Sequence, residues 1–290
     1  MRLLKWLMLA VMVVPASIGA ACADGSKVVM GQINISFYAV TAGVVQEVLE
    51  RRGHQVETKS GSHGQMFPLL DKGEIDLLVA AWLPSAHAEY WEKYGGSATQ
   101  LATLYTDAQL YWAVPSYVPM SEVAAVADLG KPDVAQRMVR TIRATAPDSG
   151  LTIGSRMIMA AYRLEEAGYE LLPGKREEWV AHLQDNVAAQ RWFVMPFFRP
   201  NYLNLGADMR MLDEPQKLLG EPSDGKLVAR KDFVSRAPER TLKALSRISI
   251  GLDGVAEMDR MVNIEKMSAR DAARTWMEQN RDAVNAWFED

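Results

Sequence analysis

The chain has 290 residues, with 32 Lys and Arg side chains against 36 Asp and Glu, a formal net charge of −4 and 49% apolar residues. This composition is typical of a globular protein with one large domain or two lobes. The basic residues are dispersed, which excludes the concentrated positive surface that binds a nucleic-acid backbone. One Cys cannot form an intramolecular disulfide, and the four His at positions 54, 63, 87 and 182 lack the close spacing of zinc ligands. We therefore expect no nucleic-acid partner, no disulfide scaffold and no metal site.

Residues 1–23 have the order of segments found in a secretory signal peptide. Arg2 and Lys5 precede an apolar run at 7–14, and Pro15 and small residues follow it. The apolar run has about half of the ~20 residues that span a bilayer, so a permanent anchor helix is not expected. Removal of this segment would take two basic residues from the 32 and leave a net charge of −6.

Cys22 lies at the expected cleavage site and leaves two outcomes open. The small residues Ala21 and Ala23 on either side suit ordinary signal peptidase, which would discard the Cys. The sequence Gly-Ala-Ala-Cys over 19–22 also resembles a lipoprotein box, in which Cys22 would be lipidated. Because Gly19 stands where Leu, Val or Ile is usual, we favour free release. Both outcomes predict a protein that works in the periplasm.

From Lys27 onward, short apolar runs alternate with helical stretches, which is typical of α/β units with largely parallel strands. The first such region predicts a helix with apolar residues at helical spacing over 44–49, ended by Gly53 as a left-handed cap. Further strands and helices are expected in chain order: strands at 28–33, 56–59 and 75–82, and helices at 66–72 and 87–94.

An extended segment at 105–114, followed by several Pro and Gly residues, predicts a first crossover into another lobe. A helix over 150–168 should bury Met157, Ala161 and Leu164 on one face. Residues 200–215 should carry the chain back, and the last seventy residues should be mostly helical, with Ser268 and Asp271 forming a capping box. The remaining expected elements are strands at 140–146, 169–172 and 192–198 and a helix at 176–190.

This pattern predicts two α/β lobes, with the second inserted into the first. We expect lobe I to comprise residues 24–114 and 208–290, and lobe II to comprise residues 115–207. A cleft between two lobes on thin connections is a natural place for a small ligand, and hinge closure is a natural motion.

No enzymatic signature is present in the sequence. It lacks a Gly-x-Ser-x-Gly elbow, a P-loop, a Gly-x-Gly-x-x-Gly turn after a strand and a His-Glu-x-x-His pair. Ser62 and His63 are adjacent and could suggest a nucleophile with a base, but a turn with a helix N-cap is the simpler interpretation. We therefore expect no catalytic residue and no cofactor.

Three other features fall where apolar runs end. The strand at 75–82 ends at Trp82, and His87 follows five residues later, in the position where open α/β sheets bind ligands. Residues 146–150 form a strand-to-helix turn whose N–H groups can hold an anion. An aromatic cluster at 196–202 ends a third run and is matched by Phe37 and Tyr38 after the first strand. Aromatic faces with N–H donors fit a small zwitterion with a quaternary ammonium head.

These residues also have ordinary interpretations. Trp82 alone could equally be a core residue, and His87 alone could be a surface or capping residue. Because side chains alternate along a strand, one of Phe197 and Phe198 must point into the lobe. The other tryptophans past the first strand are expected to be core or partly buried: Trp91, Trp112, Trp179, Trp192, Trp276 and Trp287.

The segment GEIDLLVAAWLPSAH at 73–87, followed by Tyr90 and Trp91, resembles the signature of the glycine betaine, choline and related osmoprotectant substrate-binding proteins of ABC importers. The resemblance covers nearly the whole mature chain. It implies an α/β, two-lobe periplasmic-binding-protein fold of type II with two crossover segments. Weaker matches lie at 49–54, 147–150, 210–215 and 273–276.

The resemblance also implies roles for individual residues. Trp82 would form one wall of an aromatic cage, with Phe37 or Tyr38 and Phe198 as the others, and His87 would bind the ligand carboxylate. The amide donors would be the peptide groups of Asp148, Ser149 and Gly150. Many relatives have Trp where this chain has the other two walls, which leaves the ligand open among glycine betaine, choline, carnitine and related betaines.

The implied protein is a monomer without a cofactor that delivers its ligand to an ABC transporter permease. Two alternatives remain. The same scaffold could bind another cationic or zwitterionic solute, such as an amino acid or a polyamine. An extracytoplasmic hydrolase or lyase is also conceivable, although no nucleophile and base pair is visible in the sequence.

Overall fold

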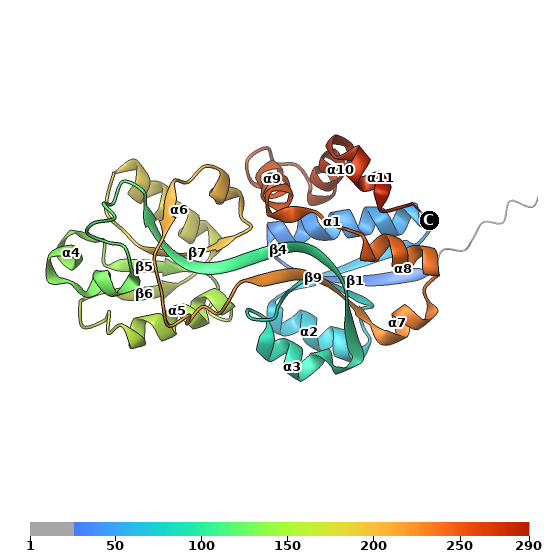
Figure 1. Cartoon of the computed structure of the whole chain (residues 1–290), viewed down its shortest axis with the longest axis horizontal. Coiled ribbons are helices and arrows are strands. Elements are labelled where there is room, and N and C mark those ends of the chain that lie inside the picture. Colours follow the sequence, from blue (N-terminus) through green and yellow to red (C-terminus); the bar gives the residue numbers. More distant parts are fainter. Residues whose placement is uncertain (1–25, 290) are drawn as a thin grey trace, which may run out of the picture.

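The structure is a computed structural model that describes residues 26–289. The predicted signal peptide at 1–23, including Cys22, lies outside the described residues. The described chain forms a larger and a smaller body, joined by one long strand and by a returning segment (Figure 1). This arrangement matches the α/β fold with two connections that the sequence predicts.

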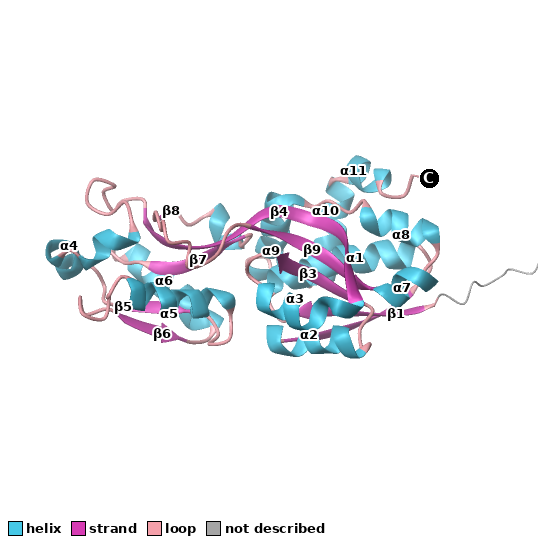
Figure 2. Ribbon diagram, turned by 60° about the horizontal axis from the view of Figure 1, so that its bottom comes forward, coloured by secondary structure: helices cyan, strands magenta, loops and turns pink. Residues whose placement is uncertain are grey.

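The larger body begins with alternating strands and helices, as predicted. Strand β1 pairs in parallel with β2 and with β3. Gly53 and Gly73 follow the first two helices with φ of +90° and +76°, the left-handed geometry that lets a helix end sharply. Every residue of β3 is buried, because helices cover both faces of the sheet there (Figure 2). The elements are β1 (Lys27–Ile33), α1 (Ser36–Arg51), β2 (Gln55–Gly61), α2 (His63–Lys72), β3 (Leu77–Leu83), α3 (Ala88–Tyr94) and η1 (Gly95–Ser97).

The smaller body has its own parallel strand pair, formed by β5 and β6, and a second cluster of buried apolar residues. The helix predicted over 150–168 ends at Ala161, and the expected burial of Met157 and Ala161 is wrong, since both are exposed; Leu164 is buried but lies beyond the helix. Ile158 and Met159 are buried instead. The elements are η2 (Val126–Gly130), α4 (Pro132–Arg137), β5 (Thr141–Ala144), α5 (Gly150–Ala161), β6 (Glu170–Pro173), α6 (Arg176–Ala188) and β7 (Met195–Arg199).

The long strand β4 (Ala98–Pro115) connects the two bodies and contains the predicted crossover. Its first part pairs with β9 (Ser223–Arg230), and its last part pairs with β7 and β8 (Met209–Met211). All of these pairings are antiparallel, because the chain leaves along β4 and returns in the opposite direction. The described sheet, in the order β2-β1-β3-β9-β4-β7, is therefore mixed, where the sequence pattern favoured largely parallel strands.

The segment expected to return to the first lobe, 200–215, contains η3 (Tyr202–Leu205) and β8. Leu212, just beyond β8, still belongs to the second apolar cluster. The chain then enters β9 in the centre of the large sheet. The predicted lobe boundaries at 114/115 and 207/208 stay a proposal.

The C-terminal part is helical, as predicted, and α9 and α10 pack against α1 at the top of the larger body (Figure 1). The side chain of Ser268 accepts a hydrogen bond from the Asp271 backbone N–H at 3.0 Å and so caps α10 as expected. Trp276 and Trp287 are buried in the main apolar cluster, whereas Trp91 and Trp192 are half-buried. The elements are α7 (Lys231–Arg236), α8 (Glu239–Ser246), α9 (Gly251–Asn263), α10 (Ala269–Gln279) and α11 (Arg281–Ala286).

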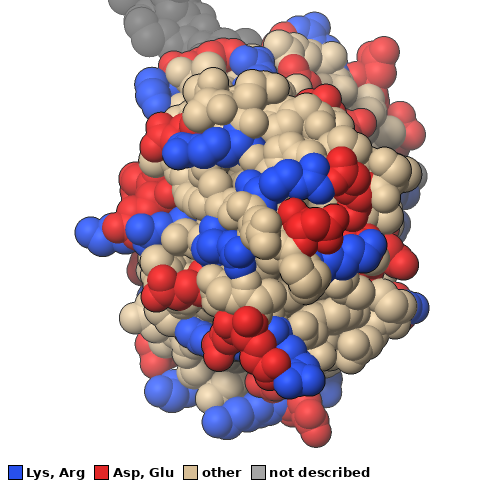
Figure 3. Space-filling view, turned by 90° about the vertical axis from the view of Figure 1, so that its left-hand side faces the viewer, with Lys and Arg blue, Asp and Glu red and all other residues tan. Residues whose placement is uncertain are grey.

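Positive and negative side chains are interspersed on the end face of the smaller body (Figure 3). This mixture agrees with the dispersed basic residues in the sequence. Among residues 26–289, no helix has both the length and the apolar character needed to cross a membrane.

Candidate ligand-binding site

A cavity of about 1060 Å³ lies where residues of the larger and the smaller body meet. Among the described residues, four helices contribute their first turns to its lining, namely α1, α2, α5 and α6. The first N–H groups of a helix have no partner within the helix and carry a partial positive charge. The cavity is therefore favourable for an anionic group at several points of its wall.

Aromatic side chains form another part of the wall. The ring centroid of Phe37 lies 5.7 Å from that of Trp82 and 5.5 Å from that of Phe198, with interplanar angles of 40° and 45°. Tyr38 lies 6.2 Å from Trp82, and all four residues line the cavity. They are only 2 to 6% exposed, so their faces are sheltered from bulk water. The sequence analysis proposed either Phe37 or Tyr38 as a wall of the site, and in the structure both residues line the cavity.

The indole of Trp82 is hydrogen-bonded to Tyr105, a residue that the sequence analysis did not identify. Its Nε1–H donates to the hydroxyl of Tyr105 on β4 at 2.8 Å, and both groups are buried. Gly225 on β9 lies in register with both residues. A Cβ at Gly225 would lie 2.2 Å from the Tyr105 ring, so only glycine lets this ring cross the strand to reach Trp82. Burial raises the pKa of Tyr105, which keeps the hydroxyl protonated.

His87 has a defined tautomer. The backbone N–H of Trp82 donates to its Nδ1 at 2.9 Å, so this nitrogen is an acceptor and the proton of the neutral ring lies on Nε2. Burial, and then the neighbouring imidazole of His63, lowers the pKa of His87 well below its ordinary value. His87 thus presents one N–H donor without a positive charge, and it lines the cavity as predicted.

The turn at Asp148, Ser149 and Gly150 leads into α5 and lines the cavity. The Ser149 hydroxyl caps the helix by accepting from the Thr152 backbone N–H at 3.2 Å, and it also bonds to the Thr145 hydroxyl at 2.8 Å. The side chain of Ser149 is therefore committed to the turn. The groups of this segment that remain for a ligand are its backbone N–H groups at the start of α5.

Phe198 is supported by Trp179 on α6. Their rings stack with centroids 5.7 Å apart and 21° between planes, and the Trp179 indole donates to the Pro196 carbonyl at 3.0 Å. Phe197 does not line the cavity; its ring packs against Tyr111, with centroids 5.8 Å apart, and against Trp179, with centroids 5.2 Å apart. Trp179 is a fully buried residue, as expected.

His63 is a cavity residue that the sequence reasoning missed. The turn and N-cap interpretation is correct for Ser62, whose backbone N–H is bonded to the Gln65 side chain at 2.8 Å in a capping box. The imidazole of His63, at the first position of α2, nevertheless lines the cavity, with its centroid 5.0 Å from that of His87. Its place directly after a strand end is the signal that could have identified it.

Asp259 on α9 is a buried acidic group that lies behind the cavity residue Arg176. Its carboxylate is fully buried and accepts from the Tyr202 backbone N–H at 2.9 Å and from the Asn263 side chain at 2.8 Å. Nη2 of Arg176, a cavity residue from α6, lies 3.8 Å away. Burial raises the pKa of Asp259, although Ser36 and Arg176 oppose this shift. The pair brings a charge from the smaller body against one from the larger body.

The comparison with known families decides what kind of protein this is. Residues 26–279 match the family described as the substrate binding domain of the ABC-type glycine betaine transport system. The chain belongs to this family. Substrate-binding proteins of ABC importers are extracytoplasmic components of transport systems, and the osmoprotectant resemblance seen in the sequence is confirmed.

Relatives of this substrate-binding domain have known structures. The chain is similar to lactococcal OpuAC in its closed, glycine betaine complex, with 22% identity, a TM-score of 0.79, and coverage of 91% of this chain and all of that one (100%). It is also similar to the glycine betaine/L-proline-binding protein ProX of Borrelia burgdorferi, with 23% identity, a TM-score of 0.78, and coverage of 91% and 97%. These similarities confirm the two-lobe type II fold.

A curated relative of the substrate-binding domain is the glycine betaine/carnitine transport binding protein GbuC of Listeria monocytogenes serotype 1/2a (strain 10403S). The two are 20% identical over 157 residues, which cover 54% of this chain and 52% of that protein. This chain thus spans about half the length of the curated relative that it matches.

Proposed function

We propose that this protein binds a quaternary ammonium solute, such as glycine betaine, choline, carnitine or a related betaine, in the cavity between the two bodies. It delivers this solute to an ABC transporter permease and does not convert it chemically. The observation that carries the proposal is the aromatic cluster, in which the Phe37 ring lies 5.7 Å from that of Trp82 and 5.5 Å from that of Phe198, beside N–H donors.

The aromatic cluster suits the cationic head. A trimethylammonium group cannot donate N–H hydrogen bonds, so it is recognised through the faces of aromatic rings. Each sheltered ring contributes roughly 1 to 2 kcal/mol, and three rings contribute about 3 to 6 kcal/mol. Tyr38 adds a fourth face to the same wall. Micromolar affinity requires about 8 kcal/mol, so the other end of the ligand must also be bound.

The polar wall suits a carboxylate. His87 supplies a neutral N–H donor, and the peptide groups of Asp148, Ser149 and Gly150 supply donors at the start of α5. Hydrogen bonds to a charged group contribute roughly 1.5 to 3 kcal/mol each, which makes up the difference. In this proposal the cage and the α5 turn bind opposite ends of one small zwitterion.

The two connections between the bodies support closure around the ligand. Arg176 and Asp259 approach each other from opposite bodies beside the cavity, and their attraction would favour the closed form. We further propose that the protein acts as a monomer in the periplasm. Export would use residues 1–23 as a signal peptide, with lipid attachment at Cys22 as the less favoured route.

Isothermal titration calorimetry with glycine betaine, choline and carnitine tests the proposal. We expect at least one of them to bind, and Trp82→Ala to weaken that binding by tenfold or more, because the variant loses about 1 to 2 kcal/mol of ring contact and the shape of the cage. Trp192→Ala is the matched control, since Trp192 is half-buried under Arg137 and does not line the cavity. Absence of binding by the whole set would refute the function.

Two other outcomes would identify the alternatives. Tighter binding of a solute without a quaternary centre, such as an amino acid or a polyamine, would indicate a different ligand on the same scaffold. Chemical change of a bound compound, followed by mass spectrometry over hours, would indicate an enzyme. We expect neither.

A further inference from the structure

The cavity contains an ionisable side chain for which the proposed function has no role. The imidazole of His63 lines the cavity next to His87, with 5.0 Å between ring centroids and 65° between planes. No hydrogen bond from the His63 side chain to another described residue is present, whereas His87 is tied to the Trp82 backbone. His63 is therefore the imidazole of this pair that is free to change its protonation state.

The groups that face His63 come from several elements. Tyr38 of α1 meets it edge-on at 6.2 Å, and burial raises the pKa of this Tyr, so it stays neutral. His87 is held neutral by its Nδ1 acceptor role and its burial. Tyr90 of α3 packs against His87, and burial raises its pKa as well. Asp148, from the turn before α5, is the charged group that acts on His63.

The α6 helix contributes charges of both signs to the same cavity. Among the described residues these are Lys175, Arg176, Glu177 and Glu178. Arg176 lies against Asp259, and Glu178 lies 3.7 Å from Arg143, so each has a partner of opposite charge. Because of these pairs, α6 supplies little net positive charge that could neutralise the carboxylate of Asp148.

The balance of charge changes when a carboxylate enters. The ligand anion would lie near Asp148, and the imidazole donors around it would be neutral. A proton on His63 would supply a positive charge between two carboxylates and remove their repulsion. We propose that His63 takes up a proton when a carboxylate-bearing quaternary ammonium ligand binds, so that the site favours betaines over choline more strongly as the pH falls. This inference rests on the proposed function.

The direction of the effect follows from linkage. In the empty cavity, burial lowers the pKa of His63, and Asp148 opposes this shift only in part. A bound carboxylate raises the pKa of His63, so proton uptake accompanies binding. The extra affinity is fully present below the pKa of the empty site and is lost as the pH rises through the pKa of the occupied site. Choline has no carboxylate, so its affinity should not increase as the pH falls.

Calorimetry between about pH 5.5 and 8, the range in which His titrates, tests this inference. Glycine betaine is titrated in two buffers of different ionisation enthalpy, and the difference in heat gives the number of protons taken up. We expect uptake of up to one proton and a change in affinity of about tenfold for each unit by which binding shifts the pKa of His63. Choline should show no gain in affinity on the acid side.

Three variants assign the proton. His63→Gln should still bind glycine betaine but lose both the proton uptake and the pH dependence. His182→Gln is the matched control, because this His lies on α6 against Phe193 and not in the cavity, and it should behave like the unmodified protein. Asp148→Asn alters an exposed side chain and should reduce the proton uptake, because Asp148 favours the charged imidazole.

The outcomes separate this inference from the proposed function. Glycine betaine binding that takes up no proton, or proton uptake that persists in His63→Gln, overturns the inference and leaves the proposed function intact. Binding of choline alone also overturns it. If no quaternary ammonium compound binds at any pH, both fail. Should His63→Gln not fold, the proton uptake of the unmodified protein and of Asp148→Asn still decides the question.

Discussion

The hydrogen bond between Trp82 and Tyr105 provides a direct test of how the aromatic cage is held. Tyr105→Phe removes one oxygen atom and keeps the ring that packs over Gly225. The indole N–H of Trp82 would then be a buried donor without a partner. The substitution therefore changes the support of the cage wall and leaves every ring of the cage in place.

The size of the effect can be worked out for stability and for binding separately. A buried donor left unsatisfied costs about 1 to 3 kcal/mol of folding free energy. Each kcal/mol lowers the melting temperature by about 2 to 4 °C in a protein of this size. The freed indole must be ordered again by the ligand, at about 0.5 to 1.5 kcal/mol, which corresponds to about 2- to 12-fold weaker binding.

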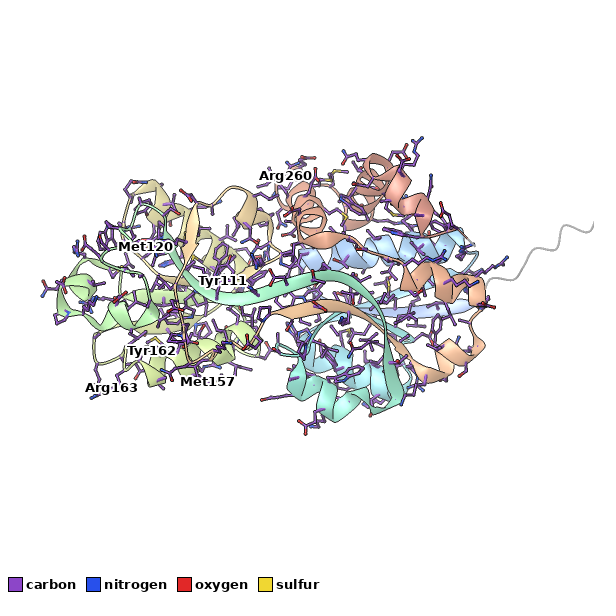
Figure 4. All side chains as sticks on the ribbon, in the orientation of Figure 1. Tyr111, Met120, Met157, Tyr162, Arg163 and Arg260 are labelled. Atoms are coloured by element: carbon purple, nitrogen blue, oxygen red, sulfur yellow. The ribbon has the colours of Figure 1, made fainter. Side chains whose placement is uncertain are left out.

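Thermal unfolding and calorimetric titration of the same preparation measure the two effects. Tyr162→Phe is the control, because it also removes a hydroxyl hydrogen bond, to Glu214 at 2.6 Å, but lies on the smaller body near α5 (Figure 4). The control should lose stability without losing affinity. An unchanged melting temperature together with unchanged affinity in Tyr105→Phe would show that Tyr105 does not position Trp82.

Three further predictions concern the same wall and the pair behind it. Gly225→Ala should weaken ligand binding more than Tyr105→Phe does, because its Cβ would lie 2.2 Å from the Tyr105 ring and would displace that ring. Calorimetric titration compares the affinities of the two variants. Phe198→Trp should bind a quaternary ammonium ligand about 2- to 5-fold more tightly, because the larger ring adds about 0.5 to 1 kcal/mol of cation–π attraction. Unchanged or weaker binding by this variant would contradict the prediction. Arg176→Gln leaves the buried carboxylate of Asp259 without its cation, so closure should cost about 1 to 3 kcal/mol more and the Kd of the ligand should rise about 5- to 150-fold. An equal Kd would exclude a role of the pair in closure.

The predicted site residues that line the cavity share a simple geometric origin. Trp82 and Phe198 lie at the ends of their strands, and the turn at 148–150 follows a strand; strand ends in α/β units gather at one edge. Local order along the chain was therefore enough to bring them to one cavity. The helix caps at Gly53, Gly73 and Ser268 were predictable for the same reason, because a cap depends on only a few neighbouring residues.

The residues that the sequence did not indicate depend on contacts over long separations. Tyr105 meets Trp82 only because β9 enters the sheet between their strands, and β9 lies more than a hundred residues later in the chain. Asp259 meets Arg176 only after the C-terminal helices have packed on α1. The antiparallel pairing of β4 has the same origin. No local pattern of apolar residues encodes the register between such distant strands.

Strand β4 links the two walls of the cage to the connection between the bodies. Trp82 is held by Tyr105, and Phe198 pairs with Leu110, so the two walls are attached to one strand about 17 Å apart. Between these points the register with β9 shifts, and Asp107 has a φ of +64° and is paired with Arg199. A bend there would move Phe198 relative to Trp82 and leave each ring on its own support. If the cavity opens by such a bend, Trp82 stays on Tyr105 and Phe198 stays on Trp179, so neither half of the aromatic cluster is disturbed.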